Sequence, residues 1–431
     1  MQIHVVQPNQ SLFGIAQAYD LSVATIARAN QLNPQQPLVV GQALVIPIVG
    51  EYYWVRPGDS LWSIARRFGI APGQLARVNR LPPAYNLPVG FRLYIPARPK
   101  RNAEANAYVE PMGPVVIPEL TSSAQEAAPY LTYLSPFSFR IRRDGSLEPL
   151  PLDNFPAIAR SGGASLVLVV SNQEEGKFSA ELGRIILNDP QVREALLNNI
   201  LRTARELGVR DVHFDLEFLR PEDKDAYTRF LREAAARLHA ANLLLSTALA
   251  PKVSATEKGG WYEAHDYRAH GQIVDFVVIM TYEWGYSGGP PLAVSPLPEV
   301  RRVLNYALTE IPAGKIMMGQ NLYGYDWTLP YVQGGPIAKV VSPQDAIDLA
   351  RRQGVAIQYD TRSQAPTFRY TDDAGRTHEV WFEDARSIQA KFDLIKELGL
   401  RGISYWKLGL PFPQNWLLLT DNFNIVKRTG R

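Results

Sequence analysis

The sequence contains no cysteine among its 431 residues. This absence excludes disulfides, thiolate zinc sites and a cysteine nucleophile. Long apolar runs are missing as well, since stretches such as 243–245 and 276–280 are far too short to span a bilayer. Residues 1–8 also lack the basic start and apolar run of a secretory signal peptide. We therefore expect a soluble protein that does not associate with membranes.

An excess of charge of one sign is also missing, because 45 Lys and Arg residues face 42 Asp and Glu residues for a net charge of +3. Proteins that bind nucleic acid through many phosphates need a basic surface, so we expect no nucleic-acid partner. No metal-ligand cluster is visible, and the glycine-rich stretch 285–289 lacks the Lys-Ser/Thr ending of a phosphate loop. We expect neither a metal nor a cofactor. The apolar content of 46% is enough for a large core, and the length suggests about three domains.

The N-terminal part contains two copies of one module, related by a shift of 49 positions. The shift is constant throughout the unit, which excludes chance similarity of composition. Each copy has the pattern of a strand, a helix, a second short helix and a closing strand. The aligned pairs are Ser11-Leu12 with Ser60-Leu61, Ile15-Ala16 with Ile64-Ala65, Asn30 with Asn79, Gly41 with Gly90, and Ile46-Pro47 with Ile95-Pro96.

The stretch Pro57-Gly58-Asp59-Ser60-Leu61-Trp62 resembles the start of the LysM domain, a module that binds glycans containing N-acetylglucosamine. The resemblance covers residues 3–48 and 52–97 and implies small α+β domains at 1–49 and 50–98. The first copy departs from the motif, with Asn9-Gln10 in place of Gly-Asp. The alternative is a pair of structural spacers. The resemblance implies that sugars bind at loops 7–13 and 33–40 of the first copy and 56–62 and 82–89 of the second.

The remaining part, after a linker at 98–102, alternates between strand-like and amphipathic helical segments. Eight such alternations favour an α/β fold with a (β/α)8 TIM barrel over an open doubly wound sheet, and we place this domain at 103–431. About 80 residues between 322 and 402 are too many for one connection, and a predicted hairpin at 368–382 indicates a small α+β insertion at about 329–385. The predicted strands are 131–133, 165–171, 212–218, 243–250, 276–282, 316–322 and 402–406, with the eighth near 108–110.

The segment 211–218 carries the strongest catalytic pattern in the chain. Side chains alternate along a strand, so His213, Asp215 and Glu217 face the barrel interior, with Glu217 at the carboxyl end where barrel active sites lie. Burying two carboxylates together is unfavourable unless one of them holds a proton, which creates a carboxylic acid able to protonate a leaving group. The alternative is a strand end whose acids simply face solvent.

This segment resembles the Asp-x-x-Asp-x-Asp-x-Glu signature of glycoside hydrolase family 18, with Asp215 and Glu217 on the last two acidic positions. Arg210 and His213 replace the earlier acids. The resemblance extends over the whole chain after the linker and includes Met280-Thr281-Tyr282-Glu283 on the sixth strand and Trp406 on the eighth.

The resemblance implies a retaining mechanism in which the substrate's own 2-acetamido oxygen is the nucleophile. Glu217 would be the acid and base, Asp215 would orient the acetamido group, and Tyr282 would bind its carbonyl. Trp406 would lie under the sugar, with a barrel-core aromatic as the alternative, and His213 would be the hydrogen-bond partner of Asp215 and a substrate-binding residue. Met280 is a further candidate for substrate binding, with core packing as the alternative, and Glu283 is another, with a solvated rim as the alternative. The last candidates, with loop capping as the alternative, are Gln320, Asn321, Tyr323 and Asp326.

Tandem LysM copies together with the variant signature resemble the spore cortex-lytic N-acetylglucosaminidases of this family. The resemblance implies a monomer in the bacterial spore that hydrolyses peptidoglycan of the cortex, or other oligomers of N-acetylglucosamine, during germination. The alternatives are a chitinase with the same mechanism and a catalytically inactive carbohydrate-binding barrel. The polar, proline-containing linker also leads us to expect that each half folds independently.

Overall fold

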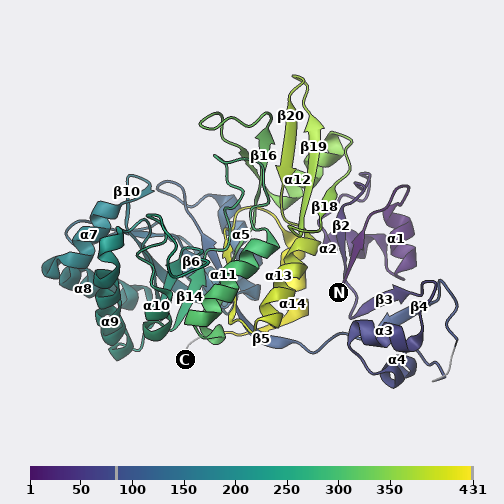
Figure 1. Cartoon of the computed structure of the whole chain (residues 1–431), viewed down its shortest axis with the longest axis horizontal. Coiled ribbons are helices and arrows are strands. Elements are labelled where there is room, and N and C mark those ends of the chain that lie inside the picture. The colour runs from purple at the N-terminus through teal and green to yellow at the C-terminus, as the bar shows by residue number, and fades with distance from the viewer. Residues whose placement is uncertain (83–85, 429–431) are drawn as a thin grey trace.

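The structure, a computed structural model, describes residues 1–82 and 86–428. Each N-terminal repeat is a two-stranded antiparallel sheet with two helices (Figure 1). Part of the predicted loop 82–89 lies outside the described residues. The first repeat contains β1 (Gln2–Val5), α1 (Leu12–Ala18), α2 (Val23–Ala29) and β2 (Ala43–Ile46), and the second contains β3 (Glu51–Trp54), α3 (Leu61–Phe68), α4 (Pro72–Val78) and β4 (Arg92–Ile95).

The repeated polar residues have the same role in both copies. Ser11 and Ser60 are the N-caps of α1 and α3, and each side chain accepts a hydrogen bond from the third residue of its helix. Asn30 ties α2 to β2, since its amide exchanges hydrogen bonds of 2.8 Å with both backbone groups of Val45. Asn79 forms the corresponding pair with Tyr94. The shift of 49 therefore preserves the contacts that hold helix and sheet together.

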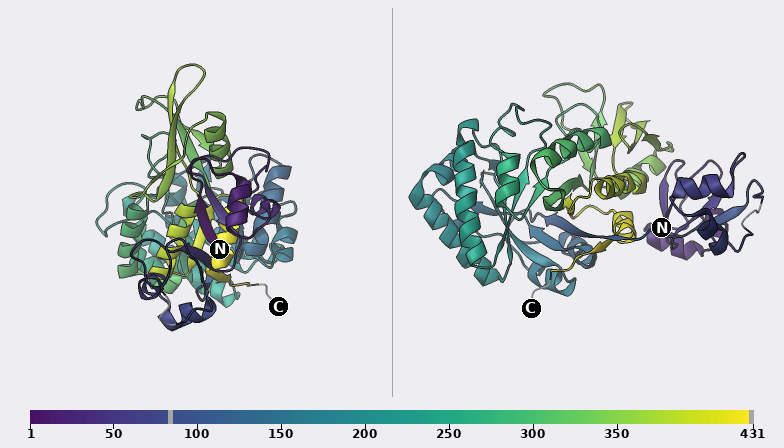
Figure 2. Two further views of the ribbon diagram at one scale, coloured as in Figure 1. Left: turned by 90° about the vertical axis from the view of Figure 1, so that its right-hand side faces the viewer. Right: turned by 60° about the horizontal axis from the view of Figure 1, so that its bottom comes forward.

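The rest of the chain forms the predicted closed barrel. Within residues 101–406, eight parallel strands pair in the ring order β12-β13-β14-β15-β21-β5-β6-β9, and β9 pairs again with β12. Helices cover the outside of the barrel, as Figure 2 shows from two sides. The strands are β5 (Arg101–Val109), β6 (Tyr133–Pro136), β9 (Ser165–Ser171), β12 (Asp211–Asp215), β13 (Leu244–Leu249), β14 (Phe276–Ile279), β15 (Ile316–Asn321) and β21 (Gly402–Trp406).

Several strand boundaries differ from the prediction; β14, for example, ends at Ile279 rather than at residue 282. The strand expected near 108–110 is the end of β5, which begins inside the predicted linker at Arg101. Strand β6 begins only at Tyr133, because residues 128–130 form a 3-10 turn before it. Strand β12 ends at Asp215 rather than at residue 218, so Glu217 lies in the loop beyond the strand.

The barrel helices are amphipathic, and their apolar faces pack on the outer faces of the strands in one continuous core. Among the described residues, no helix is both long and apolar enough to cross a membrane. The helices outside the insertion are α5 (Pro118–Ala127), α6 (Phe155–Ser161), α7 (Ala180–Asn188), α8 (Pro190–Leu207), α9 (Lys224–Ala240), α10 (Tyr267–Ile273), α11 (Leu297–Glu310), α13 (Ala385–Glu397) and α14 (Pro413–Asn422).

The insertion follows β15 and stands above the barrel in Figure 1. Its antiparallel sheet has the order β17-β16-β20-β19-β18 and has its own apolar core with α12. The sheet begins before the predicted boundary near residue 329, while the expected hairpin is formed by β19 and β20. Its elements are β16 (Gly324–Thr328), β17 (Lys339–Val341), α12 (Pro343–Arg352), β18 (Gln358–Asp360), β19 (Ala365–Thr371) and β20 (Thr377–Trp381).

The first repeat is packed against both the barrel and the insertion. Ala43 and Val45 of β2 belong to the barrel core, and Val39 belongs to the core of the insertion. The backbone N–H of Ile357 donates to the carbonyl of Val40 at 2.9 Å. Gly41 lies so close to the insertion that a Cβ atom there would be 1.8 Å from the carbonyl oxygen of Ile357.

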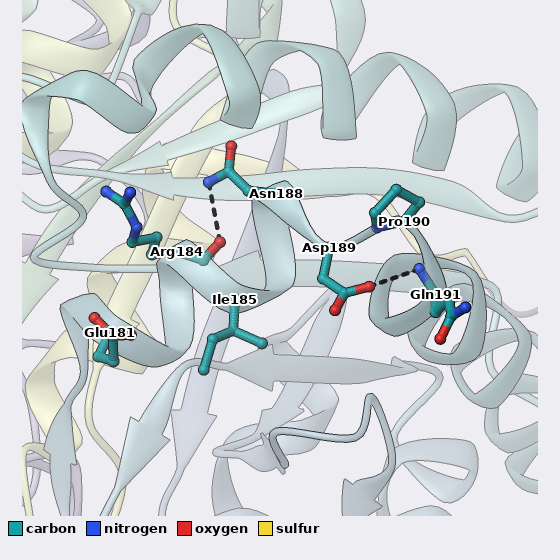
Figure 3. A pocket seen from close by; sticks show the side chains of 7 residues that line it. All are labelled: Glu181, Arg184, Ile185, Asn188, Asp189, Pro190 and Gln191. Carbon is teal, nitrogen blue, oxygen red and sulfur yellow. Dashed lines mark hydrogen bonds between the residues drawn. The ribbon is translucent and has the colours of Figure 1, made fainter.

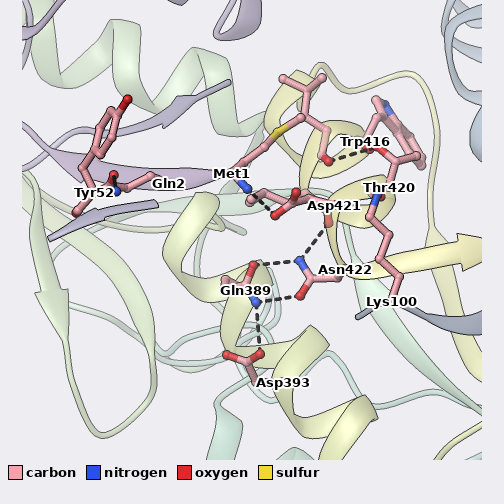
Figure 4. A network of polar contacts seen from close by, with 12 residues as sticks. Met1, Gln2, Tyr52, Lys100, Gln389, Asp393, Trp416, Thr420, Asp421 and Asn422 are labelled. Atoms are coloured by element: carbon pink, nitrogen blue, oxygen red, sulfur yellow. Dashed lines mark hydrogen bonds and ion pairs between the residues drawn. The ribbon is translucent and has the colours of Figure 1, made fainter. Parts of the chain in front are cut away.

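A polar network lies at the edge of the same junction (Figure 4). The Met1 amine pairs with Asp421 of α14, and Gln389 of α13 exchanges two hydrogen bonds of 2.9 Å with Asn422. The first repeat thus shares apolar and polar contacts with the barrel, and this arrangement argues against two halves that fold independently.

Candidate active site

The candidate site is built around the end of β12, where Asp215 and Glu217 are 5% and 8% exposed. His213, on the same strand, is buried beneath them, and both of its ring nitrogens are occupied. Its Nε2 contacts the Tyr108 hydroxyl at 2.9 Å, and its Nδ1 contacts the Ser246 hydroxyl at 2.8 Å. His213 therefore bonds to Tyr108 of β5 and Ser246 of β13 and not to Asp215 as expected, while its contact with substrate stays a prediction.

Burial sets the protonation of these groups. It raises the pKa of Asp215, and it raises the pKa of Glu217 further because the negative charge of Asp215 lies nearby. Burial also lowers the pKa of His213 to about 3, so this imidazole is neutral and contributes no charge to the site. These shifts favour the protonated form of Glu217, because burial and the charge of Asp215 act in the same direction there.

Two residues that the sequence did not single out hold Glu217 in place. The Asn172 side chain, in the loop after β9, donates to the Glu217 carbonyl and accepts from its N–H, both at 2.9 Å. The Trp261 indole N–H donates to the Glu217 carboxylate. Phe218 has a positive φ of 52° and stacks on Trp261 with an interplanar angle of 11°. For Asn172, the available signal was its position directly after a predicted strand, whereas nothing in the local pattern marks Trp261.

Glu283 is held by two tyrosines at the base of the insertion. The hydroxyls of Tyr323 and Tyr325 both donate to its Oε1, the latter at 3.0 Å. Burial raises the pKa of Glu283, and these hydrogen bonds oppose the rise. Tyr282 is 8% exposed, and burial raises the pKa of its phenol, so the hydroxyl remains protonated and able to donate. Tyr325 was missed, although it alternates with Tyr323 and Trp327.

Aromatic side chains surround these polar groups. Met280, Tyr282, Tyr323 and Trp327 pack in one cluster whose border includes Trp261 and Trp406. The Trp406 ring is also in edge contact with Phe137, with 4.8 Å between centroids, and therefore connects this cluster with the barrel interior. This apolar surface with a few buried polar groups is typical of a small-molecule or sugar site.

Two candidates are not brought to this surface. Asp326 accepts hydrogen bonds from Tyr370 at 2.7 Å and from His378 at 2.9 Å, on the face of the insertion sheet opposite Tyr325. Gln320 is fully buried and donates to the carbonyl of Asn321 at 3.0 Å. Asp326 and Gln320 are thus engaged within the protein, and their contact with substrate stays a prediction.

Asn321 is also fully buried. Its amide donates to the Tyr323 carbonyl at 2.7 Å and its oxygen accepts from Ser295 at 2.6 Å. Asn321 therefore supports the backbone of Tyr323 instead of reaching a ligand.

A wide hollow of about 740 Å³ lies elsewhere, between α7 and α8 (Figure 3). Its polar side chains are engaged locally, since Asn188 donates to the Arg184 carbonyl at 3.0 Å and Asp189 accepts from the Gln191 N–H at 2.8 Å. Among the described residues, no group of three or more His, Cys, Asp or Glu side chains is arranged to hold a metal ion.

Comparison with known proteins decides the family. The profile of glycosyl hydrolases family 18 matches residues 153–410, and the LysM profile matches residues 4–47 and 53–96. The chain belongs to glycosyl hydrolases family 18. It is a glycosidase that carries N-terminal LysM domains, which we call LysM1 (residues 1–49) and LysM2 (residues 50–98).

Full-length relatives share both parts. The chain is 63% identical over 431 residues to the cortical fragment-lytic enzyme of Bacillus subtilis, covering 100% of both chains. It superposes on the crystal structure of the spore cortex-lytic enzyme SleL of Bacillus megaterium with a TM-score of 0.92 at 55% identity, covering 99% of each chain. A chitinase of Chromobacterium violaceum, at 24% identity and a TM-score of 0.67, covers 74% of this chain and 98% of its own and shares the fold.

Proposed function

We propose that this glycosidase hydrolyses spore cortex peptidoglycan and cleaves the β-1,4 bond after N-acetylglucosamine with retention of configuration. The observation that carries the proposal is the buried pair of Asp215 and Glu217, in which the charge of one carboxyl holds the proton of the other. The full-length likeness to cortical fragment-lytic enzymes supports the choice of substrate. It also supports a location in the spore, where the enzyme acts as a monomer.

Glu217 is the proton donor in this mechanism. Its proton passes to the glycosidic oxygen as the bond from that oxygen to C1 breaks. The carboxylate that remains then removes a proton from the water that attacks C1. Asn172 and Trp261 hold the carboxyl in one orientation for both steps, because they fix its backbone and one of its oxygens.

The nucleophile is the carbonyl oxygen of the substrate's 2-acetamido group, which bonds to C1 and forms an oxazolinium ion. Asp215 accepts a hydrogen bond from the acetamido N–H and stabilises the positive charge, and the Tyr282 hydroxyl binds the acetamido oxygen. This scheme needs no second carboxylate as a nucleophile, and Glu283 instead accepts hydrogen bonds from Tyr323 and Tyr325. Attack of water on C1 reopens the ring and restores the acetamide.

The test is to incubate the purified protein with spore cortex fragments and, separately, with chitin oligomers, and to identify the products by mass spectrometry. E217Q is the control for contaminating activity. We expect products that end in N-acetylglucosamine from cortex fragments at the higher kcat/KM. Faster cleavage of chitin oligomers would favour a chitinase, and no cleavage of either substrate would contradict the proposed activity.

A further inference from the structure

The packing of LysM1 on the barrel leaves a groove of about 580 Å³ between helix α2 on one side and helices α5 and α14 on the other. We propose that this groove binds a saccharide chain of the substrate at a distance from Glu217. The inference rests on the proposed function, because the occupant is the same glycan that is cut in the barrel.

The floor of the groove has the shape and chemistry that a sugar ring requires. Tyr130 and Trp416 line it and stack on each other, with 6.0 Å between ring centroids and 12° between planes. Tyr405 supports Trp416 from behind at 5.3 Å. Both rings are partly exposed, and exposed aromatic surface of this kind packs against the C–H face of a pyranose, while the Trp indole carries a polar N–H for its hydroxyls.

The rim supplies unused hydrogen-bonding groups from both walls. Arg28 and Gln31 come from LysM1, and Gln125 and Glu126 come from the end of α5. All four are exposed, and none of these side chains forms a hydrogen bond or ion pair with another described residue. Amides and a carboxylate suit sugar hydroxyls and acetamido groups. The guanidinium of Arg28 suits the carboxylates that accompany muramic residues in peptidoglycan.

The lining of the groove overlaps that of a second cavity, which reaches the loops after β15 and β21. This small adjoining cavity shares Gln31, Glu126 and Trp416 with the groove and extends to Leu322 and Leu410. These leucines lie beyond the carboxyl ends of β15 and β21, and Leu410 packs on the aromatic cluster that contains Tyr282. The adjoining cavity has a volume of about 20 Å³, which is too small for a sugar ring, so a glycan that occupies both places has to run along the surface between the groove and Glu217.

Comparison with the second repeat indicates that the groove requires the barrel as well as LysM1. Arg77 and Arg80 of LysM2 correspond to Arg28 and Gln31 by the shift of 49, and both are exposed. The equivalent face of α4 is open, with Val78 39% exposed. The groove exists only where the module meets the barrel, and it is distinct from the loops at 7–13 and 33–40.

The first test compares R28E with R77E in the full-length enzyme. The measured quantity is kcat/KM for long soluble cortex glycans divided by kcat/KM for a short chromogenic N-acetylglucosaminide, which fills the catalytic cleft alone. We expect R28E to lower this ratio about tenfold, which corresponds to about 1.4 kcal/mol of binding. R77E should leave the ratio unchanged. An equal ratio for R28E, R77E and wild type would overturn the proposal.

The second test uses the absence of cysteine, since R28C and R77C can be alkylated at one defined position. Both changes are made in the E217Q background, so that the glycan is bound without being cut. We expect long cortex glycans to slow alkylation of R28C and to leave R77C unaffected, and equal rates for R28C with and without glycan would contradict the groove. If wild type cleaves no glycan, the proposed function fails. If wild type cleaves glycans while R28E and R28C give the same results as R77E and R77C, the proposed function stands and only the glycan site in the groove is contradicted.

Discussion

Three features of its surroundings act on Glu217, namely burial, the charge of a neighbouring carboxyl, and hydrogen bonds that fix its backbone. Burial, and after it the nearby charge of Asp215, raises the pKa of Glu217, so the acid is protonated where an exposed glutamate would be ionised. The amide of Asn172 keeps the loop that carries it in register with β9. Replacement of the acid by its amide removes the proton and retains the shape.

We therefore expect E217Q to fold normally and to lose hydrolysis by roughly 10²–10⁴-fold, because a general acid and base contributes about this much. Turnover of cortex fragments and the far-UV circular dichroism spectrum measure the two properties. Near-normal turnover of E217Q would contradict the assignment of Glu217 as the proton donor.

The charge of Asp215 predicts a change in the pH profile. Because this charge raises the pKa of Glu217, D215N should lower that pKa. The high-pH limb of kcat/KM reports loss of the Glu217 proton and should move to lower pH, together with a fall in kcat. D211N is the matched control, since Asp211 is buried at the other end of β12, and it should leave the limb in place. An unshifted limb in D215N would contradict the coupling of the two carboxyls.

Trp261 predicts the opposite shift. Its hydrogen bond to the Glu217 carboxylate lowers the pKa of that acid, so W261F should raise the pKa and extend activity to higher pH. Phenylalanine preserves the stacking on Phe218 while removing the indole N–H. The same pH series measures the effect, and a limb that moves to lower pH in W261F would show that the hydrogen bond is not the main influence of this residue.

At the scale of elements, the two repeats form a matched pair with different surroundings. Gly41 and Gly90 have the same left-handed backbone, with φ of 84° and 85°. A Cβ atom at Gly90 would meet nothing within 4 Å, whereas one at Gly41 would collide with the Ile357 carbonyl. The strain of the left-handed conformation is therefore common to both positions, and the collision belongs to Gly41 alone.

We expect G41A to lower the free energy of unfolding by about 1–3 kcal/mol more than G90A, since overpacking has a cost of this size. Scanning calorimetry on the full chain measures both variants. Equal destabilisation by G41A and G90A would indicate that the contact between LysM1 and the insertion contributes little to stability.

At the scale of the whole molecule, LysM1 is part of the catalytic body and LysM2 is attached to LysM1. The side chain of Gln2 pairs with the backbone of Tyr52 at 2.7 and 2.9 Å, and Arg92 pairs with Asp20 at 2.5 Å. The core that receives Ala43 and Val45 belongs to the barrel. The two modules should therefore differ in their contribution to barrel stability, although their sequences are related.

Two truncations test this difference. We expect a chain that begins at residue 51 to have a lower Tm than the full chain, because removal of LysM1 exposes apolar barrel surface. A chain that begins at residue 99 should have nearly the same Tm as the first truncation. Tm is followed by near-UV circular dichroism of the barrel aromatics. If both truncated chains have the same Tm as the full chain, the result would support the expectation that the two halves fold independently.

Local patterns in the sequence determined most of the architecture. A constant shift of 49 positions defined the LysM copies, and alternating and helical periodicities predicted the barrel and the hairpin of the insertion. Alternation also marked Asp215 and Glu217 as candidates, although the strand ends before Glu217. These features depend on neighbours within a few residues, which is why sequence alone suffices to predict them.

Only the tertiary structure decided which distant residues complete the site and which module joins the barrel. Asn172 and Trp261 reach Glu217 across 45 and 44 positions of sequence, and His213 finds Tyr108 across 105. The docking of LysM1 depends on Gly41 meeting Ile357, which no pattern within the repeat can indicate. Barrel closure and packing bring such pairs together, because they depend on the path of the whole chain and on the shapes of surfaces that are far apart in the sequence.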